Sequence, residues 1–216
     1  MNESELRATG LGVDLGDRAV LHDITLRAHA GESIAVAGPS GSGKTVLLLA
    51  LAGILPAARG EVVLDGLAVT TADAELRSQF GIVLQAHGLA SGLTAEENVA
   101  LPLQARGLSG DDIADRCAEA LSAVGLDDVG GRLVDSLSGG QQQRVGVARA
   151  LAGRPRVFLA DEPTAELDPP NRARVLSHLL DASAHRIVLI ASNDPEIADA
   201  CLHVAELRDG RIDAFR

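Results

Sequence analysis

The stretch Gly38-Pro39-Ser40-Gly41-Ser42-Gly43-Lys44-Thr45 decides the fold, because it matches the phosphate-binding loop pattern G-x-x-x-x-G-K-[ST]. The apolar run Ile34 to Ala37 before it predicts a buried strand, and the leucine-rich run Thr45 to Ala52 after it predicts a helix buried on most faces. Glycines at this spacing let successive backbone N–H groups turn inward around a phosphate, and the positive end of the following helix points to the same place. The alternative is a turn rich in glycine and serine that only joins strand to helix.

One residue of this loop is unusual in the composition of the chain. Lys44 is the only lysine among the 19 lysine and arginine residues, which indicates a position that needs a compact ammonium on a flexible stem. In this pattern the lysine reaches the β- and γ-phosphates of a nucleotide, and the Thr45 hydroxyl coordinates Mg²⁺. The residues predicted to hold the nucleotide here are Gly38, Pro39, Ser40, Gly41, Ser42, Gly43, Lys44, Thr45 and Val46.

Two acidic residues follow the apolar run Val157 to Ala160, which predicts another buried strand. Acidic side chains at the C-terminal end of a central strand lie in the crevice where α/β sheets bind ligands. We expect Asp161 to hold Mg²⁺ and Glu162 to polarise a water for attack on the γ-phosphate. In isolation, the same two residues are compatible with an acidic turn after a strand.

Composition limits the other function classes. The chain has 216 residues, of which 46% are hydrophobic, enough for one domain of ordinary size with a sizeable core. The formal net charge is −11, so the field around the molecule repels DNA and RNA. We therefore expect no nucleic-acid partner.

The apolar segments predict a chain without a membrane anchor. The longest apolar run, Val46 to Leu55, is far shorter than the ~18 residues that a membrane-spanning helix needs. Met1 to Gly10 has no apolar core, so we expect no secretory signal and a cytoplasmic location. Cys117 and Cys201 lack the spacing of a metal site, and packing is their expected role.

The region Ala86 to Ser136 differs in character from its strand-rich flanks. Ser109 and Asp112 have capping-box spacing, and apolar residues then recur at helical intervals as far as Gly125. After Gly140, helix and strand alternate again. This order predicts an α/β core that is interrupted by a helical insertion of about fifty residues.

The pentapeptide Leu137-Ser138-Gly139-Gly140-Gln141 resembles the signature motif of ABC-type ATPases, and Ser138 to Leu151 resembles the signature helix of that family. The resemblance extends from about Leu11 to Ile212. It implies an α/β fold with a P-loop NTPase core (parallel sheet with flanking helices), a small antiparallel β subdomain and an inserted α-helical subdomain. It further implies a single ABC ATPase domain over residues 1–216. Within it, residues 1–85 and 140–216 would form the nucleotide-binding core with its β subdomain, and residues 86–139 would form the helical subdomain.

In this family, the signature motif faces the phosphate loop of a partner subunit, so that two ATP molecules lie within a head-to-tail dimer. Ser138 and Gly140 can offer a hydroxyl and a backbone N–H at a helix N-terminus, which is a second anion-binding device. An ordinary helix cap is the alternative. The resemblance implies nucleotide contacts from Ser138, Gly139, Gly140 and Gln141. The expected partner is a second ABC ATPase subunit, and the sequence leaves open a homodimer or a heterodimer.

Two smaller motifs follow in the order that the family has. Gln85, after the predicted strand Ile82 to Leu84, matches the glutamine that contacts Mg²⁺ and the attacking water. Glu166-Leu167-Asp168 matches the loop that couples the two active sites, and places Asp168 among the implied nucleotide-site residues. The alternatives are a solvated strand end for Gln85 and a helix N-cap for Asp168.

Leu15 departs from the family pattern. The family usually places an aromatic residue in the turn before the predicted strand Val20 to Leu26, where the ring stacks on adenine, and this chain has Leu15 there. Stacking on a base is worth ~1–3 kcal/mol, so we expect ATP binding to be weaker by about tenfold or more.

Asn193 is a second departure. Ser192-Asn193-Asp194 stands where the family has a threonine–histidine–aspartate run, whose histidine bridges the γ-phosphate and the catalytic carboxylate. An asparagine side chain can donate a hydrogen bond, but it carries no charge and takes up no proton. Losing a charge-assisted bond to a transition-state oxygen typically costs ~2–4 kcal/mol, or about 10²- to 10³-fold in rate, so we expect slow turnover. The alternative is that Asn193 substitutes adequately for the histidine.

The resemblance implies the ATP-binding and ATP-hydrolysing subunit of an ABC transporter, which drives a separate integral-membrane permease from the cytoplasmic face of the membrane. Leu93 to Val99, together with Leu101-Pro102-Leu103, resembles the lipoprotein-release and macrolide-export type.

Permease contact is expected in the region Gln85 to Asn98, where Leu89, Leu93 and Val99 would form an exposed apolar patch. Core packing is the alternative for the same side chains.

Two other function classes stay open. One is a non-transport ABC protein that acts on ribosomes or DNA, against which the strong acidity argues. The other is an ATP-gated dimerisation switch with little hydrolysis. Leu15 and Asn193 favour such a switch, whereas Glu162 is a residue that a pure switch does not need.

Overall fold

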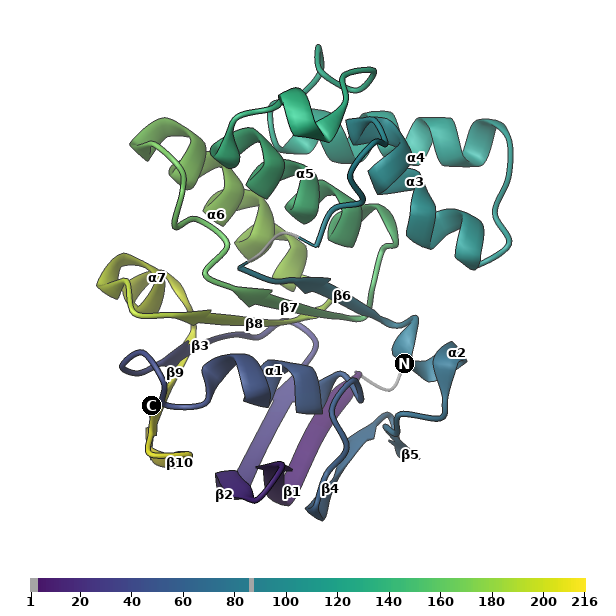
Figure 1. Cartoon of the computed structure of the whole chain (residues 1–216). Helices are drawn as coiled ribbons and strands as arrows, with labels where there is room; N and C mark the ends of the chain where they lie inside the picture. The colour runs from purple at the N-terminus through teal and green to yellow at the C-terminus, as the bar shows by residue number, and fades with distance from the viewer. Residues whose placement is uncertain (1–3, 86–87) are drawn as a thin grey trace.

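The computed structural model describes residues 4–85 and 88–216, which form two sheets with helices between and around them (Figure 1). The larger sheet has six strands in the order β10-β9-β3-β8-β7-β6. The strands from β9 to β6 in this order pair in parallel, and β10 pairs antiparallel with β9. The bounds of these strands are β3 (Ser33–Ala37), β6 (Phe80–Val83), β7 (Val157–Asp161), β8 (Ile187–Ser192), β9 (His203–Arg208) and β10 (Arg211–Phe215).

The smaller sheet is antiparallel, with its strands in the order β2-β1-β4-β5. Its strands are β1 (Glu5–Leu15), β2 (Arg18–His29), β4 (Arg59–Leu64) and β5 (Leu67–Ala68). The two sheets and the helices confirm the predicted α/β fold with a parallel core and a small antiparallel β subdomain.

Helix α1 (Lys44–Leu51) lies between the two sheets (Figure 1). It packs against β7 and β8 on one side and against β1 and β2 on the other. Helices α5 (Gly139–Ala152) and α6 (Pro169–Ser183) cover the opposite face of the parallel sheet, and the short helix α7 (Pro195–Ala200) packs against β3 and β8. The helix that follows the phosphate loop is therefore held from both sides.

The helical region lies beyond α5, on the side away from the parallel sheet (Figure 1). Helices α3 (Ala95–Ala105) and α4 (Asp111–Ala123) pack against each other and against α5. Since α5 also contacts β6, this helix belongs by its contacts to both the core and the helical region. The subdomain boundaries at residues 86 and 139 stay a prediction. The remaining short elements are α2 (Ala74–Arg77) and the 3₁₀ helix η1 (Val134–Ser136).

No helix within residues 4–85 and 88–216 is long and apolar enough to cross a membrane.

The two central strands explain why apolar runs predicted them. Every residue of β7 and β8 is buried, because helices or the smaller sheet cover both faces of the parallel sheet. Phe158 is fully buried in β7. Each apolar run ends in polar residues at the same edge of the sheet, where the chain turns toward solvent.

The predicted start of α4 is wrong. The helix begins at Asp111 with Gly110 as its N-cap, and no side chain caps it, so Ser109 lies outside the helix. Gly110 has φ of 60°, a conformation that glycine adopts readily, and Asp111 and Asp112 place negative charge in the first turn instead. The helix ends at Ala123, just before Gly125, as expected.

The expected exposed patch at Leu89, Leu93 and Val99 is also wrong, and core packing is correct for two of its members. Val99 is fully buried in α3, and the half-buried Leu89 packs against the same core. The fold turns the side of α3 that carries Val99 toward α4 and α5. The local sequence pattern alone does not specify this packing.

Both cysteines pack among apolar side chains. Cys117 is buried in α4, and Cys201 is half-buried after α7. Burial raises the pKa of each thiol to about 11, which leaves little of the reactive thiolate at neutral pH.

Candidate functional site

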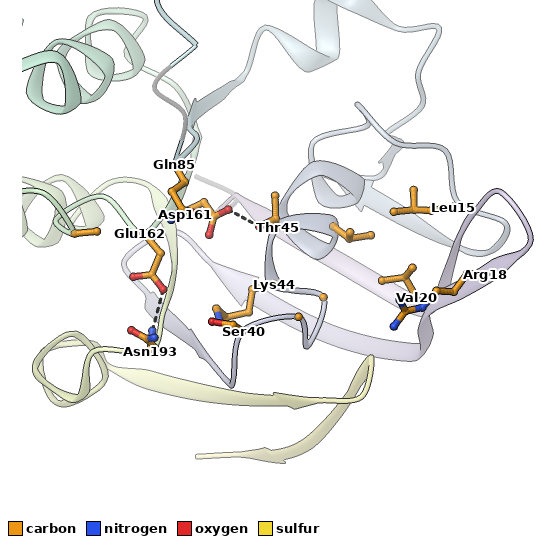
Figure 2. Close-up of a pocket in the computed structure, with 14 residues that line it drawn as sticks. Leu15, Arg18, Val20, Ser40, Lys44, Thr45, Gln85, Asp161, Glu162 and Asn193 are labelled. Carbon is orange, nitrogen blue, oxygen red and sulfur yellow. Dashed lines mark hydrogen bonds between the residues drawn. The ribbon is translucent and has the colours of Figure 1, made fainter. Parts of the chain in front are cut away.

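A cavity of about 500 Å³ opens at the C-terminal ends of the parallel strands (Figure 2). The phosphate loop between β3 and α1 forms one wall, and Asp161 and Glu162, at the end of β7, form another. Asn193 after β8, Gln85 after β6 and Leu15 at the end of β1 complete the lining. The fold thus brings together residues from five separate parts of the sequence, all of which are predicted site residues.

The C-terminal hairpin holds the phosphate loop in place. A side chain at Gly38 would clash with the backbone carbonyl of Leu207 in β9, so only glycine allows this close approach. In the turn between β9 and β10, the Gly210 N–H donates to the Ser42 carbonyl at 3.1 Å. Gly43 has φ of 106°, which residues with a side chain rarely adopt. The loop is therefore fixed by packing as well as by its own glycines.

The N-terminus of α1 carries uncompensated positive charge. Its N-cap, Gly43, provides no side-chain hydrogen bond, and its first turn holds no acidic residue. The first N–H groups of a helix have no partner within the helix, and its dipole makes this end an anion site.

Two side chains of the loop add hydrogen-bond donors. Lys44, which is 8% exposed, donates from Nζ to the carbonyls of Gly38 at 2.7 Å and Pro39 at 3.3 Å. Ser42 Oγ is buried and has no hydrogen-bond partner among the described residues. An unpartnered buried hydroxyl normally costs stability unless a ligand satisfies it. With the open helix end, these donors fit the phosphates of a nucleotide.

A candidate cation position lies between α1 and β7. Thr45 Oγ1 donates a hydrogen bond of 2.5 Å to Asp161 Oδ2 (Figure 2). In the described part of the chain, no group of three or more His, Cys, Asp and Glu side chains could hold a metal ion by itself. Mg²⁺ commonly takes one or two carboxylates and completes its shell with water and substrate phosphates. A hydroxyl and a carboxylate beside a phosphate loop fit Mg²⁺ that arrives with a nucleotide.

The Glu162 carboxylate is oriented by two donors. Ser192 Oγ donates to Glu162 Oε2 at 2.7 Å, and the backbone N–H of Asn193 donates to Oε1 at 3.1 Å. Glu162 has φ of 48°, an uncommon backbone conformation for a residue with a side chain, and such strain is concentrated at functional sites. The two hydrogen bonds hold this carboxylate at the cavity wall, where a general base would be needed.

The signature residues do not line this cavity. Ser138 caps α5: its Oγ accepts from the Gln141 N–H at 3.3 Å, and Gln141 Oε1 accepts from the Ser138 N–H at 3.0 Å. Asp168 caps α6 by accepting from the Asn171 N–H at 3.0 Å. Within a single chain, helix capping is therefore the role of Ser138, Gln141 and Asp168. The nucleotide contacts of these residues, and those of Gly139 and Gly140, stay a prediction.

One basic residue in the cavity wall was not predicted from the sequence. Arg18 lines the cavity beside Leu15 and Val20, and Leu15 and Arg18 are paired across the β1–β2 hairpin (Figure 2). The Arg18 side chain forms no hydrogen bond or ion pair with any residue that the structure describes. Only the register of the hairpin places Arg18 here, and the strand pairing was not predicted for this segment.

Comparisons with known proteins identify the family of this chain. A protein-family model described as "ABC transporter" matches residues 21–165. The lipoprotein-releasing system ATP-binding protein LolD of Anaeromyxobacter dehalogenans is 43% identical over 201 residues, covering 89% of this chain and 84% of that protein. The macrolide export ATP-binding/permease protein MacB of Shigella boydii is 41% identical over 89% of this chain. These relatives confirm the predicted resemblance to the lipoprotein-release and macrolide-export type.

Other relatives differ in length and named role. The methionine import ATP-binding protein MetN of Rhizobium johnstonii is 38% identical over 98% of this chain. The chain spans 60% of the length of MetN and 31% of the length of MacB. Among solved structures, a dimeric post-hydrolysis state of the ATP-binding cassette MJ0796 with ADP and phosphate has a TM-score of 0.89 and 29% identity, covering 98% of this chain and 97% of that one.

Proposed function

This chain belongs to the ABC transporter family of ATP-binding domains, and we propose that it binds and hydrolyses Mg·ATP to drive a separate membrane permease. The observation that carries the proposal is the position of the Glu162 carboxylate, which two hydrogen bonds hold at the wall of the cavity that the phosphate loop also lines. A phosphate site alone serves binding, whereas an oriented carboxylate beside it serves hydrolysis.

The residues of the chain divide the reaction between them. The triphosphate is bound and oriented by the open N-terminus of α1 and by Lys44. In the structure, the Lys44 ammonium donates hydrogen bonds to two carbonyls of the loop. Glu162 orients the attacking water and accepts its proton, and Gln85, which follows the neighbouring strand β6, binds that water. When bound, Mg²⁺ would supply positive charge that offsets the negative charge of the phosphates. Thr45 and Asp161 are the residues that would hold it, with Gln85.

A second ABC ATPase subunit completes the proposed site. The residues 138–141 lie at the start of α5 and contribute nothing to the cavity of their own chain. We propose that they cover the triphosphate bound to a second copy, and the dimeric state of the similar cassette MJ0796 supports this arrangement. Asp168 would then lie near the same boundary, since the Glu166 to Asp168 loop packs against the start of α5.

ATP-driven self-association tests this proposal. The Glu162→Gln variant, which retains the phosphate loop, is expected to sediment as a dimer with Mg·ATP and as a monomer with Mg·ADP or without nucleotide. The reason is that ADP alone lacks the γ-phosphate that would reach the signature residues of a second copy. Addition of Ser138→Arg should abolish the dimer. An Mg·ATP-saturated protein that stays monomeric at high concentration would contradict the proposed arrangement.

The proposed permease contact lies in a second groove. A groove of about 410 Å³ follows β6, the edge strand of the parallel sheet, and is bordered by α2, α3 and α5. Gln85 lies two residues beyond the end of β6, so a segment that docks here can influence the Gln85 loop. Arg77, Arg106 and Arg149 line the groove in a chain whose net charge is −11. We propose that an acidic cytoplasmic segment of the permease docks in this groove and holds the chain at the membrane.

Charge reversal tests the groove. The double variant Arg77→Glu and Arg106→Glu is expected to be lost from the membrane fraction of cells that contain the natural permease, because like charges repel the acidic segment. ATP hydrolysis by the isolated chain should stay within about twofold of the wild-type rate, since neither arginine lines the nucleotide cavity. Arg211→Glu, a single charge reversal on the exposed strand β10 outside the groove, is the surface control. Equal membrane recovery of all three proteins would exclude this groove.

The base of the nucleotide is proposed to lie against Leu15, Arg18 and Val20, which line the cavity at the β1–β2 hairpin (Figure 2). Without an aromatic ring there, the planar guanidinium of Arg18 is the remaining group on which a base can stack. Leu15 and Val20 supply apolar contacts beside it.

Two substitutions at this hairpin are expected to change ATP affinity in opposite directions. Leu15→Tyr should tighten binding by about tenfold, because it adds a stacking ring. Arg18→Ala should weaken ATP binding by about fivefold and leave the binding of inorganic tripolyphosphate unchanged. If Arg18 instead paired with the phosphates, the substitution would weaken the binding of both ligands. Titration calorimetry with both ligands measures this, and Arg18→Lys keeps the charge without the plane. Full recovery by lysine, or equal loss for tripolyphosphate, would contradict a stacking role.

A further inference from the structure

A buried glutamine joins the signature helix to the catalytic residue. Gln143, on α5, is 2% exposed, and both ends of its side-chain amide are hydrogen bonded to the backbone of the segment that follows β7. Nε2 donates to the Glu162 carbonyl at 2.7 Å, and Oε1 accepts from the Glu166 N–H at 3.0 Å. We propose that Gln143 is a positioning residue that couples the start of α5 to the catalytic carboxylate, an inference that rests on the proposed ATP hydrolysis.

The hydrogen bond to Glu162 holds a backbone that needs support. Glu162 adopts φ of 48°, and its N–H donates to the Ala191 carbonyl at 2.9 Å. Gln143 binds the carbonyl on the other side of the same residue. The Glu162 side chain is fixed by Ser192 at the end of β8 and by the backbone N–H of Asn193, the next residue. Gln143 is therefore the contact through which α5 reaches the residue that carries the catalytic carboxylate.

The hydrogen bond to Glu166 belongs to a larger contact between α5 and the loop before α6. A Cβ atom at Gly140 would lie 2.9 Å from the Glu166 carbonyl oxygen and 3.3 Å from Leu167 Cδ2, and one at Gly139 would clash with the Glu166 side chain. The first turn of α5 thus rests directly on Glu166 and Leu167, and a shift of this turn cannot leave the loop in place.

These contacts form one mechanical unit. Ser138 caps α5 one and a half turns before Gln143, so a ligand at the exposed start of α5 acts on the same rigid helix. Movement of that helix shifts the Glu162 carbonyl and the Glu166 N–H together, because one amide holds both. When the nucleotide of a partner copy binds at the start of α5, it therefore changes the position of the Glu162 carboxylate of this copy.

Gln142 provides a matched control on the same helix. Its Nε2 also donates to two backbone carbonyls, those of Val134 and Leu137, each at 3.1 Å. These partners precede α5 and lie outside the catalytic loop. Gln142→Leu and Gln143→Leu remove the same number of side-chain amides from one helix, but only the second disconnects Glu162 and Glu166.

The experiment compares wild-type protein with Gln143→Leu, Gln143→Glu and Gln142→Leu. Gln143→Leu should lower kcat by about a hundredfold, because a displaced catalytic group loses its near-attack geometry. KM and ATP affinity should change by less than about threefold, since Lys44 and the phosphate loop are untouched. Gln143→Glu keeps an acceptor for the Glu166 N–H but loses the donor to the Glu162 carbonyl, so it should also lower kcat. Gln142→Leu should retain kcat within about threefold.

Backbone hydrogen exchange supplies a readout that does not depend on turnover. Exchange in the segment 162–168 should rise in Gln143→Leu and not in Gln142→Leu. Equal kcat and equal exchange in these two variants would overturn the proposal, as would failure of both Gln143 variants to fold while Gln142→Leu folds. Wild-type protein that binds ATP without hydrolysing it would instead refute the proposed ATPase function, and the exchange measurement would still decide the role of Gln143.

Discussion

Glu162→Gln is expected to lower the rate of ATP hydrolysis by about a thousandfold while ATP still binds. General-base catalysis typically contributes about 10²- to 10⁴-fold, and a carboxamide cannot take a proton from the attacking water. Nucleotide binding should persist because Lys44, Ser42 and the open end of α1 form the phosphate site without Glu162. Phosphate release from purified protein measures the rate, and calorimetric titration with ATP measures binding.

Glu61→Gln is the control for this change. Glu61 is an exposed residue of β4 that does not line the cavity, so its substitution removes the same charge without touching the site. Hydrolysis that is unaffected by Glu162→Gln would show that the activity belongs to another site or another protein. Wild-type protein that binds ATP without hydrolysing it would favour the ATP-gated switch, the alternative that Leu15 and Asn193 suggest.

Asn193→His is expected to raise the hydrolysis rate by about a hundredfold. The residue lines the cavity, and its backbone N–H already contacts the Glu162 carboxylate, so a side chain at this position lies beside both the base and the substrate. An imidazole can donate a charge-assisted bond to a transition-state oxygen, which is worth ~2–4 kcal/mol in other enzymes. The measurement is steady-state phosphate release at saturating Mg·ATP.

Asn193→Gln and a pH series serve as controls. Glutamine keeps an uncharged amide and should give no gain. The histidine variant should acquire a pH dependence of kcat near the titration range of imidazole, about pH 6 to 7, that the wild-type protein lacks. Equal rates for asparagine and histidine would mean that the asparagine is no handicap. Faster turnover only after mixing with a different ABC subunit would instead indicate a heterodimer.

The phosphate loop and the central strands could be predicted because local sequence specifies them. The loop needs glycines, a lysine and a hydroxyl at fixed spacing, and β7 and β8 are continuous apolar runs because both faces of the sheet are covered. Asp161 and Glu162 were found by the same reasoning, since the end of such a strand lies at the ligand-binding edge.

The strand β1 carries no such local signal. Gly10 and Gly12 interrupt its pattern of apolar and polar residues, and register shifts occur in its pairing with β2 between Ala8 and Leu11 and again before Val13. A strand with bulges does not keep a strict alternation of side chains. The position of Arg18 in the cavity depends on this pairing, so it could not be predicted from the sequence.

Contacts made across the fold could not be predicted either. Gln143 meets Glu162 and Glu166, which lie 19 and 23 residues away along the chain. Gln143 is one of three consecutive glutamines in the sequence. It is the buried one because of how α5 packs, which the sequence alone does not show. The burial of Val99 has the same origin, since it depends on how α3 packs against α4 and α5.

A crystal structure of the Glu162→Gln variant with Mg·ATP tests the proposed arrangement of two subunits. It should contain two copies related by a two-fold axis, with each γ-phosphate bound by Lys44 of one copy and by Ser138 of the other. A triphosphate that lies outside the phosphate loop would contradict this arrangement, and so would one bound by a single copy whose Ser138 faces solvent.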